Sequence, residues 1–240
     1  MISAKIVMDI GKSLTYLFDD DRWVVKLLIG TGLMILSFLI IPIFFVQGYL
    51  VKIVRNMLDG LENPLPEWED WGKLFMDGLY LTIAGIVYSA PVWLLMICGM
   101  AVFLPAGLTE GDLSSTLVAA GGVGFMLLTC LAMILGVAIS LLYPAITVQY
   151  AREDNLGACF RFSEIIAMTR ENLGDVIIAL LVLFGLGIVL GLLGVIPLIG
   201  WVIALVASFY TTVVSGHLFG QIGRNMVGGK EKSFDSPLTP

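Results

Sequence analysis

Charged side chains are scarce in this chain. Only 13% of its 240 residues are Asp, Glu, Lys or Arg, whereas 58% are hydrophobic. A soluble domain carries about 25% charged residues, so the polar side chains here are too few to cover a water-facing surface. The composition therefore excludes an ordinary soluble domain and predicts a protein whose main solvent is the lipid bilayer.

Several kinds of site are excluded by what the sequence lacks. The net charge is −6 and no basic run is present, which argues against nucleic acid as a partner. His217 is the only histidine, so one chain cannot build a bis-histidine haem site or a His-rich metal site. Cys98, Cys130 and Cys159 form no close pair, and we expect three reduced, buried thiols. Glycine-rich phosphate loops, nucleophile elbows and HExxH motifs are also missing, so we expect neither a cofactor nor an enzymatic activity.

A short polar segment, residues 63–71, separates the first hydrophobic block from the rest of the chain. Its prolines end the incoming helix, and its carboxylates are predicted in the first turn of the next helix, where the positive end of the helix dipole stabilises them. Trp68 and Trp71 are three residues apart, so their rings are predicted on one helix face at headgroup depth. The segment is therefore either an interfacial helix start or an acidic and aromatic platform for a partner. The residues of that platform are Glu67, Trp68, Asp70 and Trp71.

Long hydrophobic runs predict an all-α fold, a polytopic integral membrane helical bundle with about six hydrophobic segments and amphipathic helices at the interface. We expect one membrane domain over residues 1–226, followed by a disordered tail at 227–240. Tyr143 and Pro144 are expected to end one span, and a turn at 196–200 divides the last two. The expected parts are an interfacial helix at 1–21, a first hydrophobic block at 23–58, a cytoplasmic interruption at 59–73, two spans at 74–142, a cytoplasmic interfacial segment at 143–175 and two spans at 176–226.

The block at 23–58 has two interpretations. One spanning helix has a suitable length, since about 20 apolar residues cross the hydrocarbon core, but Pro42 lies in its middle. A hairpin that turns near Pro42 has short arms and needs Lys26, Lys52 and Arg55 to reach one face of the membrane. With the hairpin, all 13 Lys and Arg residues of the chain fall on one side, and charge therefore favours it. This predicts a multi-pass protein of the inner (plasma) membrane with both termini in the cytoplasm.

Polar and small residues near or within the spans suggest two further roles. The four long spans hold no charge outside their first and last turns, which argues against an ion-coupled transporter. A passive path for a neutral or lipidic molecule would be lined by polar side chains, foremost Gln149, His217 and Gln221. His217 and Gln221 are four residues apart, so we expect them to share a polar contact. Gly187 and Gly191 form a small-xxx-small pair, which serves either packing within the chain or self-association.

Several stretches together resemble a known family. They are PLPEWEDWGKLFMDG at 64–78, GACFRFSEI at 157–165 with NLGD at 172–175, and GHLFGQ at 216–221. These stretches resemble an uncharacterised family of polytopic prokaryotic membrane proteins, domain of unknown function 4013, over nearly the whole chain up to Met226. That family has no assigned activity, so the resemblance implies location and architecture and adds no site.

These observations favour a non-enzymatic integral membrane protein. We expect a self-associating scaffold or an accessory subunit of another membrane complex, with the lipid bilayer and a membrane protein as its partners. The alternative is a passive transporter or channel for a small neutral or lipidic molecule. A lipid-modifying enzyme that uses Asp70, Glu164 or His217 is the least favoured hypothesis, because the sequence has no clustered nucleophile and base.

Overall fold

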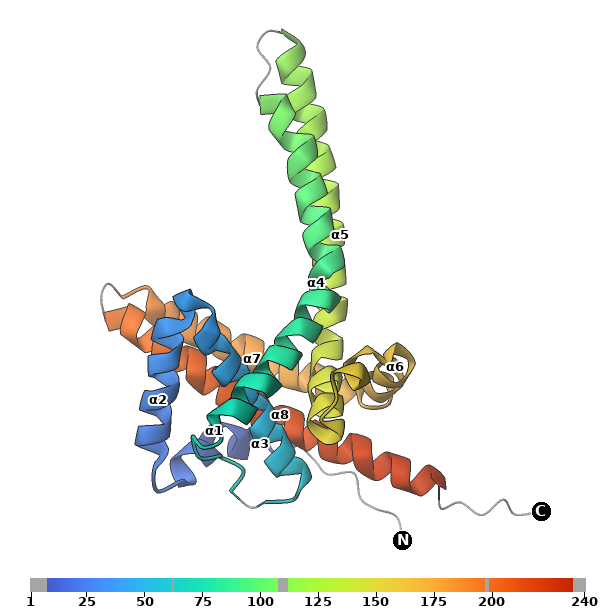
Figure 1. The fold of residues 1–240 in the computed structure, drawn as a ribbon. Coiled ribbons are helices and arrows are strands. Elements are labelled where there is room, and N and C mark those ends of the chain that lie inside the picture. The colour runs from blue at the N-terminus through green and yellow to red at the C-terminus, as the bar shows by residue number, and fades with distance from the viewer. Residues whose placement is uncertain (1–7, 62, 108–111, 197–198, 235–240) are drawn as a thin grey trace, which may run out of the picture. The chain divides into compact units, whose positions relative to one another are not determined.

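A computed structural model of the chain describes residues 8–61, 63–107, 112–196 and 199–234, and every regular element in these ranges is helical (Figure 1). Five helical segments are long and apolar enough to cross a membrane, or six if the bent pair Ile10–Asp19 and Trp23–Leu39 counts as one span. The predicted all-α membrane fold is confirmed. The elements are α1 (Ile10–Thr15), η1 (Tyr16–Asp19), α2 (Trp23–Ile35), η2 (Leu36–Leu39), α3 (Ile41–Leu58), α4 (Trp71–Gly107), α5 (Asp112–Glu153), η3 (Leu156–Phe160), α6 (Phe162–Glu171), α7 (Leu173–Gly194) and α8 (Ile199–Phe234).

Residues 23–58 form two helices. α2 and α3 pack against each other and are joined by the short 3-10 segment η2. Ile40 has a φ of 68°, a left-handed conformation that interrupts the helix. Pro42 lies in the first turn of α3, where its fixed φ suits a helix start and its missing N–H costs nothing. Pro42 therefore begins a second helix and does not kink a longer one.

The polar segment that follows α3 is irregular. α4 begins only at Trp71, and its first turn contains no acidic residue. Asp70 has a φ of 52°, so the helix cannot extend backwards past it. The prediction that the carboxylates lie in the first turn, with Trp68 on the same helix, is therefore wrong. Side chains of α3 hold the segment instead, because Tyr49 Oη donates to the Pro66 carbonyl at 2.8 Å and Asn56 Nδ2 to the Pro64 carbonyl at 3.0 Å.

The chain divides into two compact units, residues 1–84 with 142–240 and residues 85–141. In the first unit, α8 packs against α1, α2, α3 and α7. α3 and α4 cross with their backbones in contact, since a Cβ added at Gly48 would lie 1.8 Å from the Leu74 carbonyl oxygen. Gly220 of α8 similarly faces Met57 of α3, whose Cβ would be 2.4 Å from an added Cβ. Glycines thus set the close approach of three helices in this unit.

The second unit consists of the parts of α4 and α5 within residues 85–141. Gly99 of α4 faces Phe125 of α5, where an added Cβ would lie 3.1 Å from the ring. Most large apolar side chains point outward; Trp93, for example, is 64% exposed. Cys98 and Cys130 are also exposed, so the expectation of three buried thiols is wrong for these two. A thiol on an apolar helix surface that faces lipid does not need other side chains of the protein to cover it.

Several helix ends differ from the expected ones. α5 continues through Tyr143 and Pro144 to Glu153, because the Pro144 region is buried by its neighbours and tertiary packing outweighs the proline. α8 extends to Phe234, so the first part of the tail at 227–240 is helical, and residues 235–240 lie outside the described residues. α7 ends before the expected turn at 196–200, of which residues 197–198 also lie outside the described residues.

The expected interfacial helix at 1–21 is described from residue 8 onward. α1 is only six residues long and continues as η1. Ser13, Tyr16 and Leu17 are buried, and Tyr16 Oη donates to the Val213 carbonyl of α8 at 2.8 Å. The described part of this segment therefore packs on α8.

Candidate functional site

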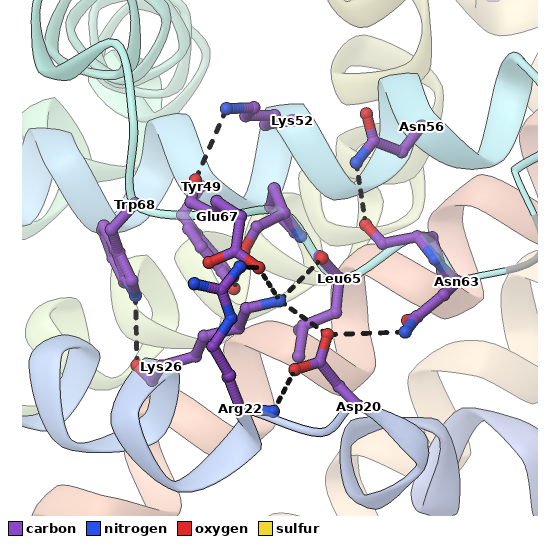
Figure 2. A network of polar contacts seen from close by, with 12 residues as sticks. Asp20, Arg22, Lys26, Tyr49, Lys52, Asn56, Asn63, Leu65, Glu67 and Trp68 are labelled. Carbon is purple, nitrogen blue, oxygen red and sulfur yellow. Dashed lines mark hydrogen bonds and ion pairs between the residues drawn. The ribbon is translucent and has the colours of Figure 1, made fainter.

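The polar segment at 63–71 surrounds the ammonium group of Lys26 (Figure 2). Lys26 Nζ lies 2.6 Å from Asp20 Oδ2 and 2.8 Å from Glu67 Oε1, and it donates to the Leu65 carbonyl at 3.3 Å. The Lys26 side chain is only 3% exposed. Three acceptors match the three N–H donors of an ammonium, so this buried charge is fully paired. Lys26 is thus bound by groups within the protein, and its expected position at one face of the membrane stays a prediction.

Asp20 remains charged in this cluster. Burial alone would raise its pKa, but the hydrogen bonds from Lys26 and from the Arg22 backbone N–H, together with the charge of Lys26, outweigh burial and lower the pKa. Asn63 Nδ2 also donates to Asp20 Oδ2 at 3.4 Å. Asp20 and Lys26 therefore form a true ion pair at the start of α2, and the hydrogen bond from Asn63 joins the polar segment to it.

The aromatic side chains of the polar segment are also used within the chain. Trp68 donates its Nε1–H to a backbone carbonyl of α2 at 3.1 Å, and its ring stacks on Tyr49 with 4.2 Å between centroids. Trp71 stacks on Trp68 with 5.6 Å between centroids and stays exposed. Of the expected partner platform, Glu67 and Trp68 thus serve the fold, whereas Asp70 and Trp71 remain at the surface.

A second polar cluster forms around Asp77, in the second turn of α4. Its carboxylate is only 1% exposed and lies 2.9 Å from Arg55 Nη1 of α3. Lys73 Nζ lies 2.9 Å from Asp77 Oδ1, and Tyr150 Oη of α5 donates to the same oxygen at 2.8 Å. Asp77 therefore links three helices, although the sequence did not single it out. A carboxylate inside an apolar run is the signal that could have identified it.

Asp154 extends this cluster beyond the end of α5. Lys73 Nζ lies 2.7 Å from Asp154 Oδ2, and Arg55 Nη2 lies 3.2 Å from Asp154 Oδ1. The hydrogen bond from Lys73 lowers the pKa of Asp154 despite partial burial, and the charges of Lys73 and Arg55 add to this effect. Arg55 of α3 thus pairs with Asp77 of α4 and with Asp154 just after α5, and its expected position at one face of the membrane stays a prediction. The positive and negative side chains of the cluster, Arg55, Lys73, Asp77 and Asp154, balance each other.

The expected polar path divides into separate networks. Ser13 Oγ and Gln221 Nε2 lie 2.9 Å and 3.0 Å from His217 Nδ1, and the predicted contact between His217 and Gln221 is confirmed. Gln221 Oε1 also accepts the Asp9 backbone N–H at 2.8 Å. His217 and Gln221 are both buried. This network therefore fastens the start of α1 to α8.

Gln149 belongs to another network. Its Nε2 donates to Glu153 Oε1 at 2.9 Å and to Glu164 Oε2 at 3.2 Å, which joins α5 to α6. Its Oε1 is buried and has no partner within the described residues. Gln149 shares no hydrogen-bond partner with His217 or Gln221, so the expected path residues are not brought together.

Gly187 and Gly191 do not serve packing within the described part of the chain. A Cβ added at either position would meet nothing within 4 Å. Phe184, Ile188 and Leu192 on the same helix are 68%, 50% and 68% exposed. α7 thus presents an apolar surface with two open glycines to its surroundings.

The described residues contain no group of three or more His, Cys, Asp or Glu side chains that could hold a metal ion.

A family model described as "Protein of unknown function (DUF4013)" matches residues 35–199, more than half of the chain. The matched range contains the polar segment and the Asp77 cluster, and it ends before His217. No curated protein and no solved structure matches the chain.

Proposed function

The chain belongs to the DUF4013 family of proteins of unknown function, and from that premise we propose that it is a non-enzymatic membrane scaffold, which assembles with itself or as a subunit of another membrane complex. The open face of α7 carries the proposal. Gly187 and Gly191 lie on one face of this helix, with exposed Phe184 and Ile188 beside them. Helices in a bilayer associate where small residues let two backbones approach closely, so this face suits a helix of another chain.

A passive transporter is the alternative function. It is supported by the Oε1 of Gln149, a buried acceptor with no partner within the described residues, which could bind a passing neutral molecule. The remaining polar groups of the expected path are used in holding helices together. His217 and Gln221 bond to each other and to the α1 segment, which leaves them little capacity for a permeating molecule. The hydrogen bonds of His217 and Gln221 therefore support the scaffold more than the transporter.

The scaffold is tested by counting chains in membranes. We would fuse a fluorescent protein to the chain, capture membrane patches in nanodiscs and count photobleaching steps. Wild type should show two or more photobleaching steps if it assembles with itself, and a defined second protein should purify with it if it is a subunit of another complex. The variant Gly187→Leu with Gly191→Leu should lose that assembly. Leu has a higher helix propensity than Gly by about 0.8 kcal/mol, so the helix itself should persist.

Gly174→Leu is the matched control. Gly174 is also open, but it lies thirteen residues before Gly187 and so about 20 Å away along α7. This variant should assemble as wild type does. If the double variant at Gly187 and Gly191 assembles as well as wild type, the α7 face is not the assembly surface.

We further propose that both termini lie in the cytoplasm of a cell with an inner (plasma) membrane. The contacts support one common side for the basic residues, because Lys26 meets the polar segment, Arg55 and Lys73 meet Asp154, and Arg161 meets Glu153. Cytoplasmic segments are where Lys and Arg accumulate. A cysteine placed at Lys12 in a cysteine-free background should resist an impermeant maleimide on intact cells, and labelling from outside would contradict the proposal.

A further inference from the structure

A hollow of about 630 Å³ lies where two helices, α3 and α5, end beside α8. It is lined by Arg55 and Asp59 near the end of α3, Arg152 and Asp154 near the end of α5, and Arg224 of α8. α3 ends at Leu58 and α5 ends at Glu153, so most of the lining residues are within a few positions of the end of a candidate span. The hollow is therefore expected at the depth of the lipid headgroups.

The arginine side chains that line this hollow differ in how many of their N–H groups already have a partner within the described residues. Arg55 is committed to Asp77 and Asp154. Arg224 donates from Nε to the Met57 carbonyl at 2.6 Å, and its two Nη groups have no partner within the described residues. Arg152 is exposed and makes no hydrogen bond or ion pair with any described residue. One guanidinium and part of another are thus free to bind a ligand.

The charge of the hollow favours an anion. Arg55 and Lys73 balance Asp77 and Asp154, which leaves Arg152 and Arg224 against the single carboxylate of Asp59. The remaining formal charge is therefore positive. Guanidinium groups bind phosphate oxygens through paired N–H donors, and volumes of about 300–1,000 Å³ are usual for small-molecule sites.

We propose that this hollow binds the phosphate of a membrane phospholipid, with Arg152 and Arg224 donating to the phosphate oxygens. The half-buried side chain of Leu58, which also lines the hollow, would lie against the glycerol end of the acyl chains. A soluble phosphate compound offers the same chemistry, but the position of the hollow at the ends of α3 and α5, two candidate spans, favours a lipid. The site is independent of the α7 face, so it holds whether or not the scaffold assembles as proposed.

The test uses the delipidated full chain in a neutral detergent, titrated with dioctanoyl phosphatidylglycerol and followed by native mass spectrometry. Dioctanoylglycerol, which lacks the phosphate, serves as the control lipid. Wild type should bind the phospholipid at one preferred site and the control lipid at least about tenfold more weakly, as expected for the loss of charge-assisted hydrogen bonds. Equal binding of the two lipids would overturn the proposal.

Arg152→Gln should weaken phospholipid binding by about tenfold, since one charge-assisted hydrogen bond is lost. Because Arg152 has no described partner, this variant should fold as wild type even if Arg224→Gln does not. Arg170→Gln removes another exposed guanidinium, on α6 and outside the hollow, and should bind as wild type. Asp59→Asn removes the opposing charge and should tighten binding, a gain that misfolding cannot produce.

Two results would refute the assignment. Arg152→Gln and Arg170→Gln could bind the phospholipid equally, which would place the lipid elsewhere. Alternatively, glycerol 3-phosphate or inorganic phosphate could compete as strongly as the phospholipid, which would make the ligand a soluble anion and not a lipid.

Discussion

Replacement of Asp77 by Asn is the perturbation whose effect the structure predicts most sharply. The change keeps the shape of the side chain and an acceptor for Tyr150 Oη, but it removes the charge that pairs with Arg55 and Lys73. Complete loss of one partner of a buried ion pair costs about 3–5 kcal/mol. Both cations here are partly exposed, at 25% and 46% of their side chains, and both also reach Asp154.

These alternative contacts reduce the expected loss. Arg55 and Lys73 can turn toward Asp154 and water, so we expect Asp77→Asn to lower the free energy of unfolding by about 1–3 kcal/mol. Asp77→Leu should cost more, because it also strands the buried hydroxyl of Tyr150. The assay is reversible unfolding in detergent mixtures, followed by tryptophan fluorescence, with Tyr150→Phe as the variant that removes one hydrogen bond and no charge. Tyr150→Phe should lose about 0.5–1.5 kcal/mol. An Asp77→Asn protein as stable as wild type would refute the assignment of Asp77 as the residue that links three helices.

Three further predictions follow from the other sites. Lys26→Met should destabilise the fold by about 3–5 kcal/mol in the same unfolding assay, because it leaves the buried carboxylate of Asp20 without its cation, whereas Glu67 keeps Arg22 at 2.8 Å. Lys52→Met should cost far less, since Lys52 only donates to a carbonyl at 3.4 Å. The lowered pKa of Asp154 means that its stabilisation is complete above its unfolded pKa of about 3.9 and is lost as the pH falls through the lower folded value. In Asp154→Asn, the free energy of unfolding should therefore fall less steeply as the pH is lowered through that range. An unchanged pH dependence would contradict the role of Lys73. Cys159 should not react with a small maleimide at neutral pH until the protein is denatured, because burial raises the pKa of its thiol to about 11. Rapid labelling of Cys159 in the native protein would contradict this and would show an accessible thiolate.

The helical membrane fold was predictable because it depends on composition and on the length of apolar runs. The contact between His217 and Gln221 was predictable for a similar reason, since residues four apart on a helix share a face. Proline and charge together also indicated the break before α3, where Pro42 occupies a first turn. These features are local, and local chemistry is sufficient to specify them.

The polar clusters could not be predicted from local chemistry. Asp77 meets Arg55 and Tyr150, which are 22 and 73 positions away in the sequence. Lys26 is buried because a segment some 40 residues later folds over it, and a pairing of that kind leaves no periodic pattern. The same segment delays the start of α4, because two of its carbonyls accept hydrogen bonds from the side chains of Tyr49 and Asn56 and not from the backbone of a helix. Tertiary contacts outweighed the helix-start signals of its prolines and carboxylates.

Assembly in the bilayer is the central claim, and native mass spectrometry of the protein released gently from its own membrane tests it most directly. The account predicts a mass of two or more chains, or of one chain with a defined second membrane protein, and it predicts that Gly187→Leu with Gly191→Leu reduces this mass to one chain. A wild-type protein that is detected as a monomer at all concentrations, with a small neutral molecule bound, would contradict the scaffold and favour the passive transporter.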